Sequence, residues 1–97
     1  MLVFEWDDAN RRHMAEHGAA PEEAEQVLLN EPIDLPAQMR SGEERSVQVG
    51  ETDEGRILMV VTTWRGGRVR VVTAFPGNRT TRRKYMERRD YGETGGQ

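Results

Sequence analysis

The segment from residue 45 to residue 75 constrains the fold most, because it consists of three strand-like stretches joined by short turns. Arg45 to Val49 alternates between polar and apolar residues, which predicts a strand with one buried face. Arg56 to Trp64 is rich in β-branched and apolar residues, so we expect it to be the central strand. Gly66-Gly67 suits a two-residue hairpin turn, and Arg68 to Phe75 then alternates again. The segment therefore predicts an antiparallel β-meander.

Two short helices are expected before this meander. Asp7 or Asp8 provides an N-cap for the first, which runs to about His17, and Gly18 fits the left-handed position that ends many helices. Pro21 suits the first turn of the second helix. That helix carries its core-facing residues at helical spacing, and these are Ala24, Val27 and Leu28.

The remaining segments complete an α+β domain. Val3 to Trp6 reads as a short strand, and residues 37–44 read as a polar loop. Asn78 can cap a last helix from about Arg79 to Arg89. We expect one domain over residues 1–91, followed by a flexible tail over residues 92–97. The predicted architecture is an antiparallel meander packed with two N-terminal helices and one C-terminal helix.

Composition excludes several classes of protein. The chain has 97 residues and no cysteine, so neither disulfides nor thiolate metal sites can support the fold. The longest apolar run, Ile57 to Val61, is far too short to span a membrane. The first residues, Met1 to Glu5, lack the basic and apolar regions of a signal peptide. We therefore expect a cytoplasmic protein that does not bind membranes.

The net charge of −3 hides a strong asymmetry along the chain. Residues 1–55 carry 14 acidic and 4 basic side chains, whereas residues 56–97 carry 3 acidic and 10 basic ones. Lys84 is the only lysine, and arginine is the residue whose planar fork suits phosphate best. A local basic surface can bind an anion although the whole molecule is acidic.

The basic side chains form two groups that a short connection joins. On the last strand Arg68, Arg70 and Val72 are expected on one face, and Val69, Val71 and Thr73 on the other. On the last helix three arginines have i, i+3 and i+4 spacing, and these are Arg79, Arg82 and Arg83. We expect the two groups to converge on an anion, although any single arginine is better explained by a solvated face with local ion pairs.

Other side chains could take part in chemistry, and each has a plainer explanation. His13 and His17 have i, i+4 spacing, but no third ligand is indicated, so a metal site is not expected. His17, Tyr85 or Glu43 could move a proton, yet Tyr85 could equally dock its helix on the sheet. Trp64 could stack on a base, or it could lie at the edge of the core.

Taken together, these segments resemble the BrnT toxin family. The resemblance covers about residues 3–88, and its motifs keep the family's order and spacing. They are Phe4-Glu5-Trp6-Asp7 with Asn10, His17-Gly18, Pro21-Glu22-Glu23-Ala24, Gly42-Glu43-Glu44-Arg45, Gly50, Gly55-Arg56, Arg70-Val71-Val72-Thr73-Ala74 and Arg82-Arg83-Lys84-Tyr85.

The resemblance implies a RelE-like fold and a metal-independent endoribonuclease toxin that arrests growth without a cofactor. Its reaction is attack of the ribose 2′-OH on the adjacent phosphate. With the arginine cluster, it leads us to expect catalytic roles for Arg45, Arg70, Arg79 and Arg83, assisted by Tyr85 or His17. Further RNA contacts are expected from Arg56, Arg68, Arg82 and Lys84.

The resemblance also implies a BrnA-like antitoxin that binds both the toxin and DNA. A hetero-oligomer with that antitoxin is expected, so that DNA is contacted only indirectly. One position departs from the family, because Phe75 stands where another arginine is typical. The departure favours an alternative, a non-catalytic binding module that acts through a partner protein and nucleic acid. In either case we expect the site to lie between the strand ending near Phe75 and the helix beginning near Arg79.

Overall fold

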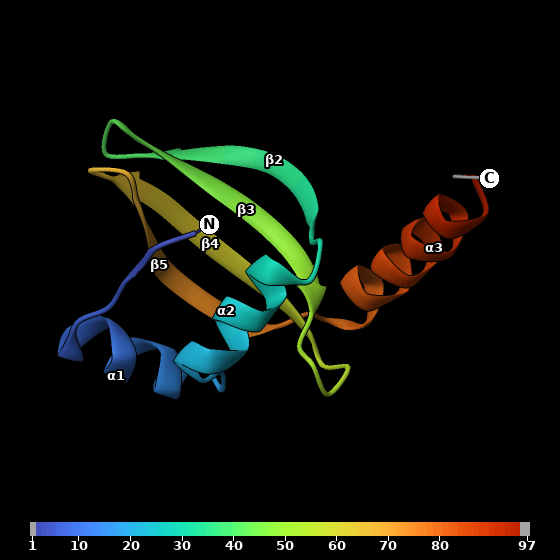
Figure 1. The fold of residues 1–97 in the computed structure, drawn as a ribbon, viewed down its shortest axis with the longest axis horizontal. Coiled ribbons are helices and arrows are strands. Elements are labelled where there is room, and N and C mark those ends of the chain that lie inside the picture. The colour runs from blue at the N-terminus through green and yellow to red at the C-terminus, as the bar shows by residue number, and fades with distance from the viewer. Residues whose placement is uncertain (1, 96–97) are drawn as a thin grey trace.

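The computed structural model describes residues 2–95, over which the chain forms three helices and one five-stranded sheet (Figure 1). The fold class is α+β, as predicted. In chain order the elements are β1 (Phe4–Glu5), α1 (Asp8–Glu16), α2 (Pro21–Leu29), β2 (Ile33–Arg40), β3 (Glu43–Glu51), β4 (Ile57–Arg65), β5 (Arg68–Pro76) and α3 (Arg79–Gly95).

The strand order in the sheet is β1-β5-β4-β3-β2, so β4 is the central strand, as its composition predicts. Strands β2 to β5 pair antiparallel with their neighbours in the chain. Strand β1 instead pairs parallel to β5, with Phe4 opposite Val69 and Glu5 opposite Arg70. The expected antiparallel meander is therefore corrected to a mixed sheet, because the N-terminal segment adds a parallel edge strand.

The prediction of a polar loop over residues 37–44 is wrong. Strand β2 reaches Arg40, and β3 begins at Glu43. Between them Ser41 and Gly42 have φ of 52° and 77°, which suits a tight hairpin turn. The strand was missed because it lies at the sheet edge, where polar side chains and Pro36 are tolerated.

Helices α1 and α2 cover one face of the sheet, which we call the helix side. Asp7 caps α1 by accepting a hydrogen bond from the Asn10 N–H, and Asn10 returns one to the Asp7 N–H. The Asn10 amide also donates to the Val71 carbonyl and so ties α1 to β5. The core between helices and sheet is built from Met14, Ala19, Ala24, Val27, Leu28, Leu58, Val60, Val69, Val71 and Ala74.

A β-bulge changes the side of the sheet toward which the side chains of β5 point. Val61 lies opposite Thr73 but Thr62 lies opposite Val71, so Val72 is the extra residue. Val71 and Ala74 are both buried on the helix side, and Thr73 faces the opposite side. The prediction that Val69, Val71 and Thr73 share one face is therefore wrong for Thr73, because the extra residue reverses the alternation of side chains beyond Val71. We call the side opposite α1 and α2 the open face.

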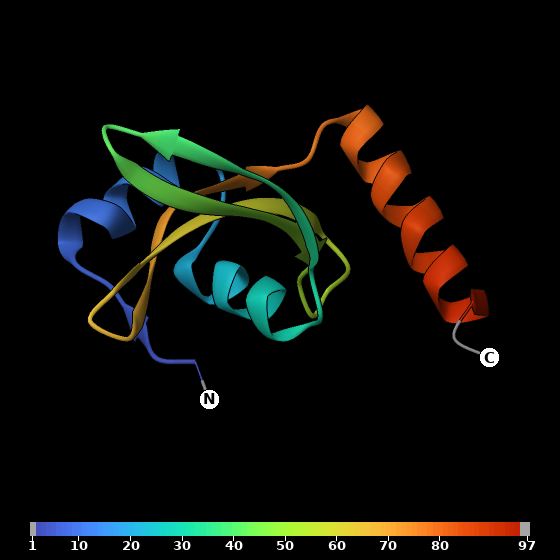
Figure 2. The same ribbon diagram turned by 90° about the horizontal axis from the view of Figure 1, so that it is seen from above.

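Helix α3 leaves the sheet at the end of β5 and lies beyond that end of the sheet in both views (Figures 1 and 2). The described molecule is correspondingly long, with extents of 40 × 26 × 25 Å. The helix runs to Gly95, past the predicted end at Arg89. Residues 92–95 of the expected tail thus belong to this helix, and residues 96–97 lie outside the described part.

Candidate functional site

Five polar side chains, one from each strand, form a row across the open face. Gln38 lies opposite Arg45, Thr63 lies opposite Arg70, and Glu5 lies opposite Arg70 from the other side. The pairing of Ser46 with Thr62 places Arg45 next to Thr63, which closes the row between β3 and β4. We call this set the polar row, and its members are Gln38, Arg45, Thr63, Arg70 and Glu5.

The polar row and its surroundings contain buried polar atoms that lack a hydrogen-bond partner. Among the described residues these atoms are Glu5 Oε2, Arg45 Nε and Thr73 Oγ1, and all three side chains belong to the open face. Arg45 Nε is 3.7 Å from a Glu43 carboxylate oxygen, which is close enough for an ion pair but too long for a hydrogen bond. Unpartnered buried polar atoms are few in native proteins, so these three atoms are positions at which a ligand or a water molecule can supply a hydrogen-bond partner.

Arg70 is held in place by the residue that caps α1. Its Nη2 lies 3.0 Å from Asp7 Oδ2, and the Arg70 side chain is the more buried of the two. The backbone hydrogen bond from Asn10, followed by the Arg70 hydrogen bond, holds the pKa of Asp7 below its ordinary value. Asp7 therefore stays ionised and orients Arg70 along the open face.

A second row of charged side chains lies next to the polar row, on the side of the β2–β3 and β4–β5 hairpin turns. Arg40 is opposite Glu43 and Arg65 is opposite Arg68, and Arg65 lies 3.6 Å from Glu43. This end of the open face thus carries five arginines, which are Arg40, Arg45, Arg65, Arg68 and Arg70. An arrangement of this kind suits phosphate, since each guanidinium offers several N–H donors in a fixed plane.

The arginines of α3 do not join this set. From Arg70 to Pro76 the strand advances six residues, roughly 20 Å at the rise of a β-strand. Arg79, Arg82 and Arg83 begin only after that, and all three are exposed. The expected convergence of the strand and helix arginines is therefore not observed, because an extended strand separates them.

The expected site near Phe75 is apolar where it meets the sheet. Phe75 lies opposite Met59 on the open face, between the arginine-rich end and α3. Farther along, a cavity of about 360 Å³ separates the first turns of α3 from β2 and β3. Its lining is Ile33, Leu35 and Val49 from the sheet and Thr81, Lys84, Tyr85 and Arg88 from α3.

Arg56 has a structural position on the helix side. Its Nη1 lies 2.5 Å from Glu23 Oε2, and its Nη2 donates to the Gly18 carbonyl at 3.1 Å. These contacts join the residue before β4 to the start of α2 and to the turn that precedes α2. The expected contact of Arg56 with RNA is thus less favoured than a local ion pair.

The proton-carrying candidates also lie away from the polar row. His17 is the C-cap of α1, at the opposite end of that helix from Asp7, and its ring lies 4.6 Å from that of His13. The Tyr85 ring is buried, and its hydroxyl donates to Glu51 Oε1 at 3.2 Å, at the far end of β3 from Arg45. The positions of His17 and Tyr85 are those of capping and docking residues.

Sequence reasoning missed Glu5, Thr63 and Thr73. For Glu5 a signal existed, because it lies between Phe4 and Trp6, two apolar residues that pack on the core, and alternation places it on the other face. For Thr63 and Thr73 only the strand order and the bulge reveal their position. Among the side chains that the structure describes, those of residues 2–89, no three His, Asp or Glu residues gather as a metal site would require. In the same part of the chain no helix combines the length and apolarity needed to cross a membrane.

Comparison with known proteins agrees with the resemblance in the sequence. A family model described as "Ribonuclease toxin, BrnT, of type II toxin-antitoxin system" matches residues 6–84. The match takes in α1, α2, strands β2 to β5 and the first turns of α3. A search of curated proteins found no match.

Proposed function

The chain belongs to the BrnT family of ribonuclease toxins of type II toxin–antitoxin systems, and from this premise we propose that it cleaves RNA on the open face, at the polar row. The observation that carries the proposal is the alignment of Arg45, Thr63, Arg70 and Glu5 across neighbouring strands, with unpartnered buried atoms among them. The family also implies an antitoxin protein as partner.

Arg45 and Arg70 suit the phosphate that reacts. As the 2′-oxygen forms its bond to phosphorus, negative charge grows on the equatorial phosphate oxygens, and fixed guanidinium groups stabilise that charge. The bond from phosphorus to the 5′-oxygen then breaks, which leaves a cyclic phosphate and a free 5′-OH. Because arginine supplies the positive charge, the proposal routes no step through a metal ion.

The reaction also needs a group that accepts the proton of the 2′-OH, and arginine cannot do this because it stays protonated. Glu5 is the carboxylate of the polar row, next to Arg70, and one of its oxygens has no hydrogen-bond partner. We propose Glu5 for this role in place of His17, which ends α1 as its C-cap residue, and Tyr85, whose hydroxyl docks α3 on Glu51. The protonated Glu5 can then return this proton to the leaving 5′-oxygen, directly or through a water molecule.

The test is cleavage of total RNA by the purified protein in the presence of EDTA. We expect cleavage by the wild type, and a loss of about 10²-fold or more in Arg70→Ala or Arg45→Ala, the size seen when a transition-state contact is removed. Glu5→Gln should lose about 10²- to 10⁴-fold while RNA binding persists. The matched control is Arg56→Ala, which removes an arginine from the helix side and should cleave as the wild type does.

Cleavage that resists both Arg45→Ala and Arg70→Ala would show that the reaction occurs elsewhere on the molecule. Cleavage that stops on addition of EDTA and returns with a divalent cation would refute the metal-independent mechanism. In both cases the folded state of each variant is checked by circular dichroism, so that a loss of fold is not mistaken for a loss of chemistry.

One observation favours a second function, a binding module without catalysis. Phe75 stands where the resemblance to the family implies an arginine, and the middle of the open face is apolar there, with Met59 opposite. Such a module binds RNA in a salt-sensitive way without turnover. It predicts that affinity falls in Arg45→Ala and Arg70→Ala although no RNA is cut by any form of the protein.

The finer features of the family are part of the same proposal. We propose a RelE-like arrangement of the sheet and helices, a BrnA-like antitoxin bound in a hetero-oligomer, and contact with DNA only through that antitoxin. A cytoplasmic location fits an RNA substrate. Co-expression with the gene that adjoins this one, followed by purification of a complex, tests the partner directly.

A further inference from the structure

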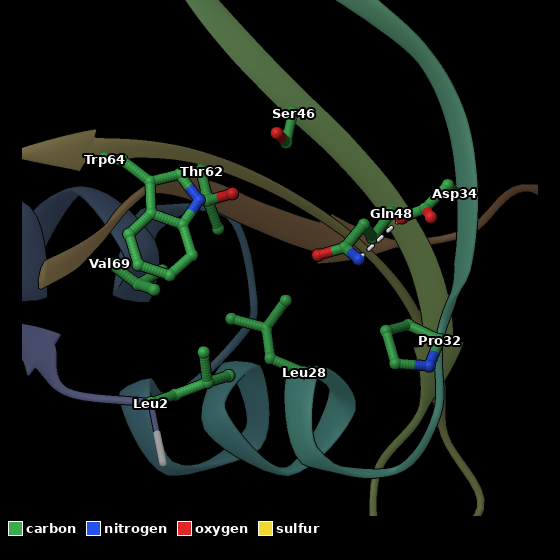
Figure 3. A pocket seen from close by; sticks show the side chains of 9 residues that line it. All are labelled: Leu2, Leu28, Pro32, Asp34, Ser46, Gln48, Thr62, Trp64 and Val69. Carbon is green, nitrogen blue, oxygen red and sulfur yellow. Dashed lines mark hydrogen bonds between the residues drawn. The ribbon is translucent and has the colours of Figure 1, made fainter. Parts of the chain in front are cut away.

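A second cavity, of about 210 Å³, lies on the helix side, between the end of α2 and strands β2 to β4 (Figure 3). Apolar side chains form its walls, among them Leu28 and Val69. Its floor is polar, because Ser46, Gln48 and Thr62 reach it from β3 and β4. Apolar walls with a few convergent polar groups are typical of a small-ligand site, and the volume is below the roughly 300–1,000 Å³ that hold larger ligands.

The polar groups of the floor are already oriented. Gln48 Nε2 donates to Asp34 Oδ1 at 2.7 Å, which leaves the Gln48 amide oxygen as an acceptor that points into the cavity (Figure 3). The Thr62 side chain beside it is almost wholly buried. The cavity therefore offers an acceptor to a ligand that brings an N–H group.

Trp64 gives the cavity a flat aromatic wall. Its side chain lines the cavity together with Thr62, yet the residue is 57% exposed. An exposed tryptophan ring provides a stacking surface for another planar ring. Asp34 carries a negative charge at the same cavity, which disfavours a phosphate there. The preferred ligand is thus planar, uncharged and able to donate a hydrogen bond.

We propose that this cavity binds a single nucleobase that carries an amino group, stacked on Trp64 and donating to Gln48. The proposal rests on RNA being the ligand of this protein. Trp64 and Arg65 are neighbours on β4 and point to opposite faces. An RNA strand that crosses the Gly66-Gly67 turn can therefore place its phosphates on Arg65 and Arg68 while one base enters the cavity.

The experiment measures quenching of tryptophan fluorescence by short 2′-O-methyl oligonucleotides, which cannot be cleaved by 2′-OH attack. Oligocytidine and oligouridine form a matched pair, because cytosine has an amino group where uracil has a carbonyl. We expect oligocytidine to quench and to bind more tightly than oligouridine. Trp64→Leu should weaken oligocytidine binding about 5- to 150-fold, the range for one base stacked on an aromatic ring.

Two variants separate the stacking from the amine contact. In Trp64→Phe the quenching should vanish while binding largely remains, which shows that the signal comes from Trp64 rather than from Trp6. In Gln48→Leu the preference for cytidine over uridine should disappear. Equal quenching of the wild type by the two oligonucleotides, or an unchanged preference for cytidine in Gln48→Leu, would overturn the amine contact. Unchanged affinity in Trp64→Leu would overturn the site.

Failure of this inference can be told apart from failure of the proposed function. If the wild type cuts RNA but Trp64→Leu binds oligocytidine as the wild type does, only the nucleobase site is refuted. If no RNA is cut but oligocytidine quenches Trp64 and needs Gln48, the cavity binds a nucleobase in a protein that does not cleave.

Discussion

Replacing Tyr85 by phenylalanine separates the two roles that the sequence leaves open for this residue. Its hydroxyl donates to Glu51 at 3.2 Å, and only 5% of the residue is exposed. From Arg45 to Glu51 strand β3 advances six residues, roughly 20 Å. A hydroxyl at that distance cannot reach a phosphate held at Arg45, so we expect it to dock α3 rather than to move a proton.

The magnitude follows from the single group removed. An intramolecular hydrogen bond of this kind contributes about 1 kcal/mol, because water competes for both partners. Loss of about 1 kcal/mol from the docking of α3 corresponds to roughly fivefold faster hydrogen exchange of its amides. RNA cleavage should stay within about threefold of the wild type, whereas removal of a proton-transfer group costs about 10²- to 10⁴-fold.

The assays are amide hydrogen exchange of α3 and RNA cleavage, both measured on Tyr85→Phe and on Arg45→Ala. The two variants should behave in opposite ways, since Arg45→Ala is expected to abolish cleavage and leave exchange of α3 unchanged. A loss of cleavage of about 10²-fold in Tyr85→Phe, with exchange of α3 unaltered, would refute the docking role and make Tyr85 the acid or base.

Two further substitutions test the packing and the cap. In Gly50→Ala the new Cβ would lie 3.1 Å from two carbon atoms of α2 and the following loop, so we expect a loss of about 1–3 kcal/mol in the free energy of unfolding. Gly77→Ala is its control, because the nearest side-chain carbon is 3.4 Å away, and equal urea midpoints would contradict the packing argument. The cap hydrogen bond from Asn10 and the contact with Arg70 lower the pKa of Asp7. The ionised Asp7 side chain therefore stabilises the folded state fully above about pH 4. This stabilisation is lost as the pH falls through the lowered pKa of Asp7. The free energy of unfolding should therefore fall less steeply with decreasing pH in Asp7→Asn than in the wild type. Identical pH profiles for the two proteins would disprove this.

Local signals in the sequence predict much of the fold. A cap at Asp7 or Asp8, the start of α2 at Pro21 and the Gly66-Gly67 turn are each set by a few neighbouring residues. The structure confirms all three and places the cap at Asp7. The central position of β4 follows from its near-continuous apolar composition. These features depend on backbone geometry and burial over short distances, which a sequence shows directly.

Strand β2 and the bulge at Val72 depend on distant partners. Residues 33–40 include Pro36 and several polar side chains, and they form a strand because β3 offers a paired edge. The bulge exists only in the register between β4 and β5. Since one extra residue reverses the alternation, the burial of Ala74 in place of Thr73 could not be read from the pattern alone.

The candidate site illustrates the same limit. Arg56 and Arg70 look alike in the sequence, each within or beside a strand, yet Arg56 pairs with Glu23 on the helix side and Arg70 lies on the open face. Which face an arginine occupies depends on register, and which arginines meet depends on strand order. The sequence therefore predicted a cationic site but grouped the strand arginines with those of α3.

The ion pair between Arg70 and Asp7 explains how one oxygen of the Glu5 carboxylate stays unpartnered beside several arginines. Arg70 is the strand neighbour of Glu5, and without another partner its guanidinium would pair with that carboxylate. Asp7 instead takes Arg70 at 3.0 Å, which leaves Glu5 Oε2 without a partner. The Asp7 side chain is half exposed, so its pair with Arg70 is weak and a phosphate can displace it at little cost. In the proposed mechanism, the Asp7 cap thus keeps the Glu5 carboxylate and the Arg70 guanidinium apart until RNA binds.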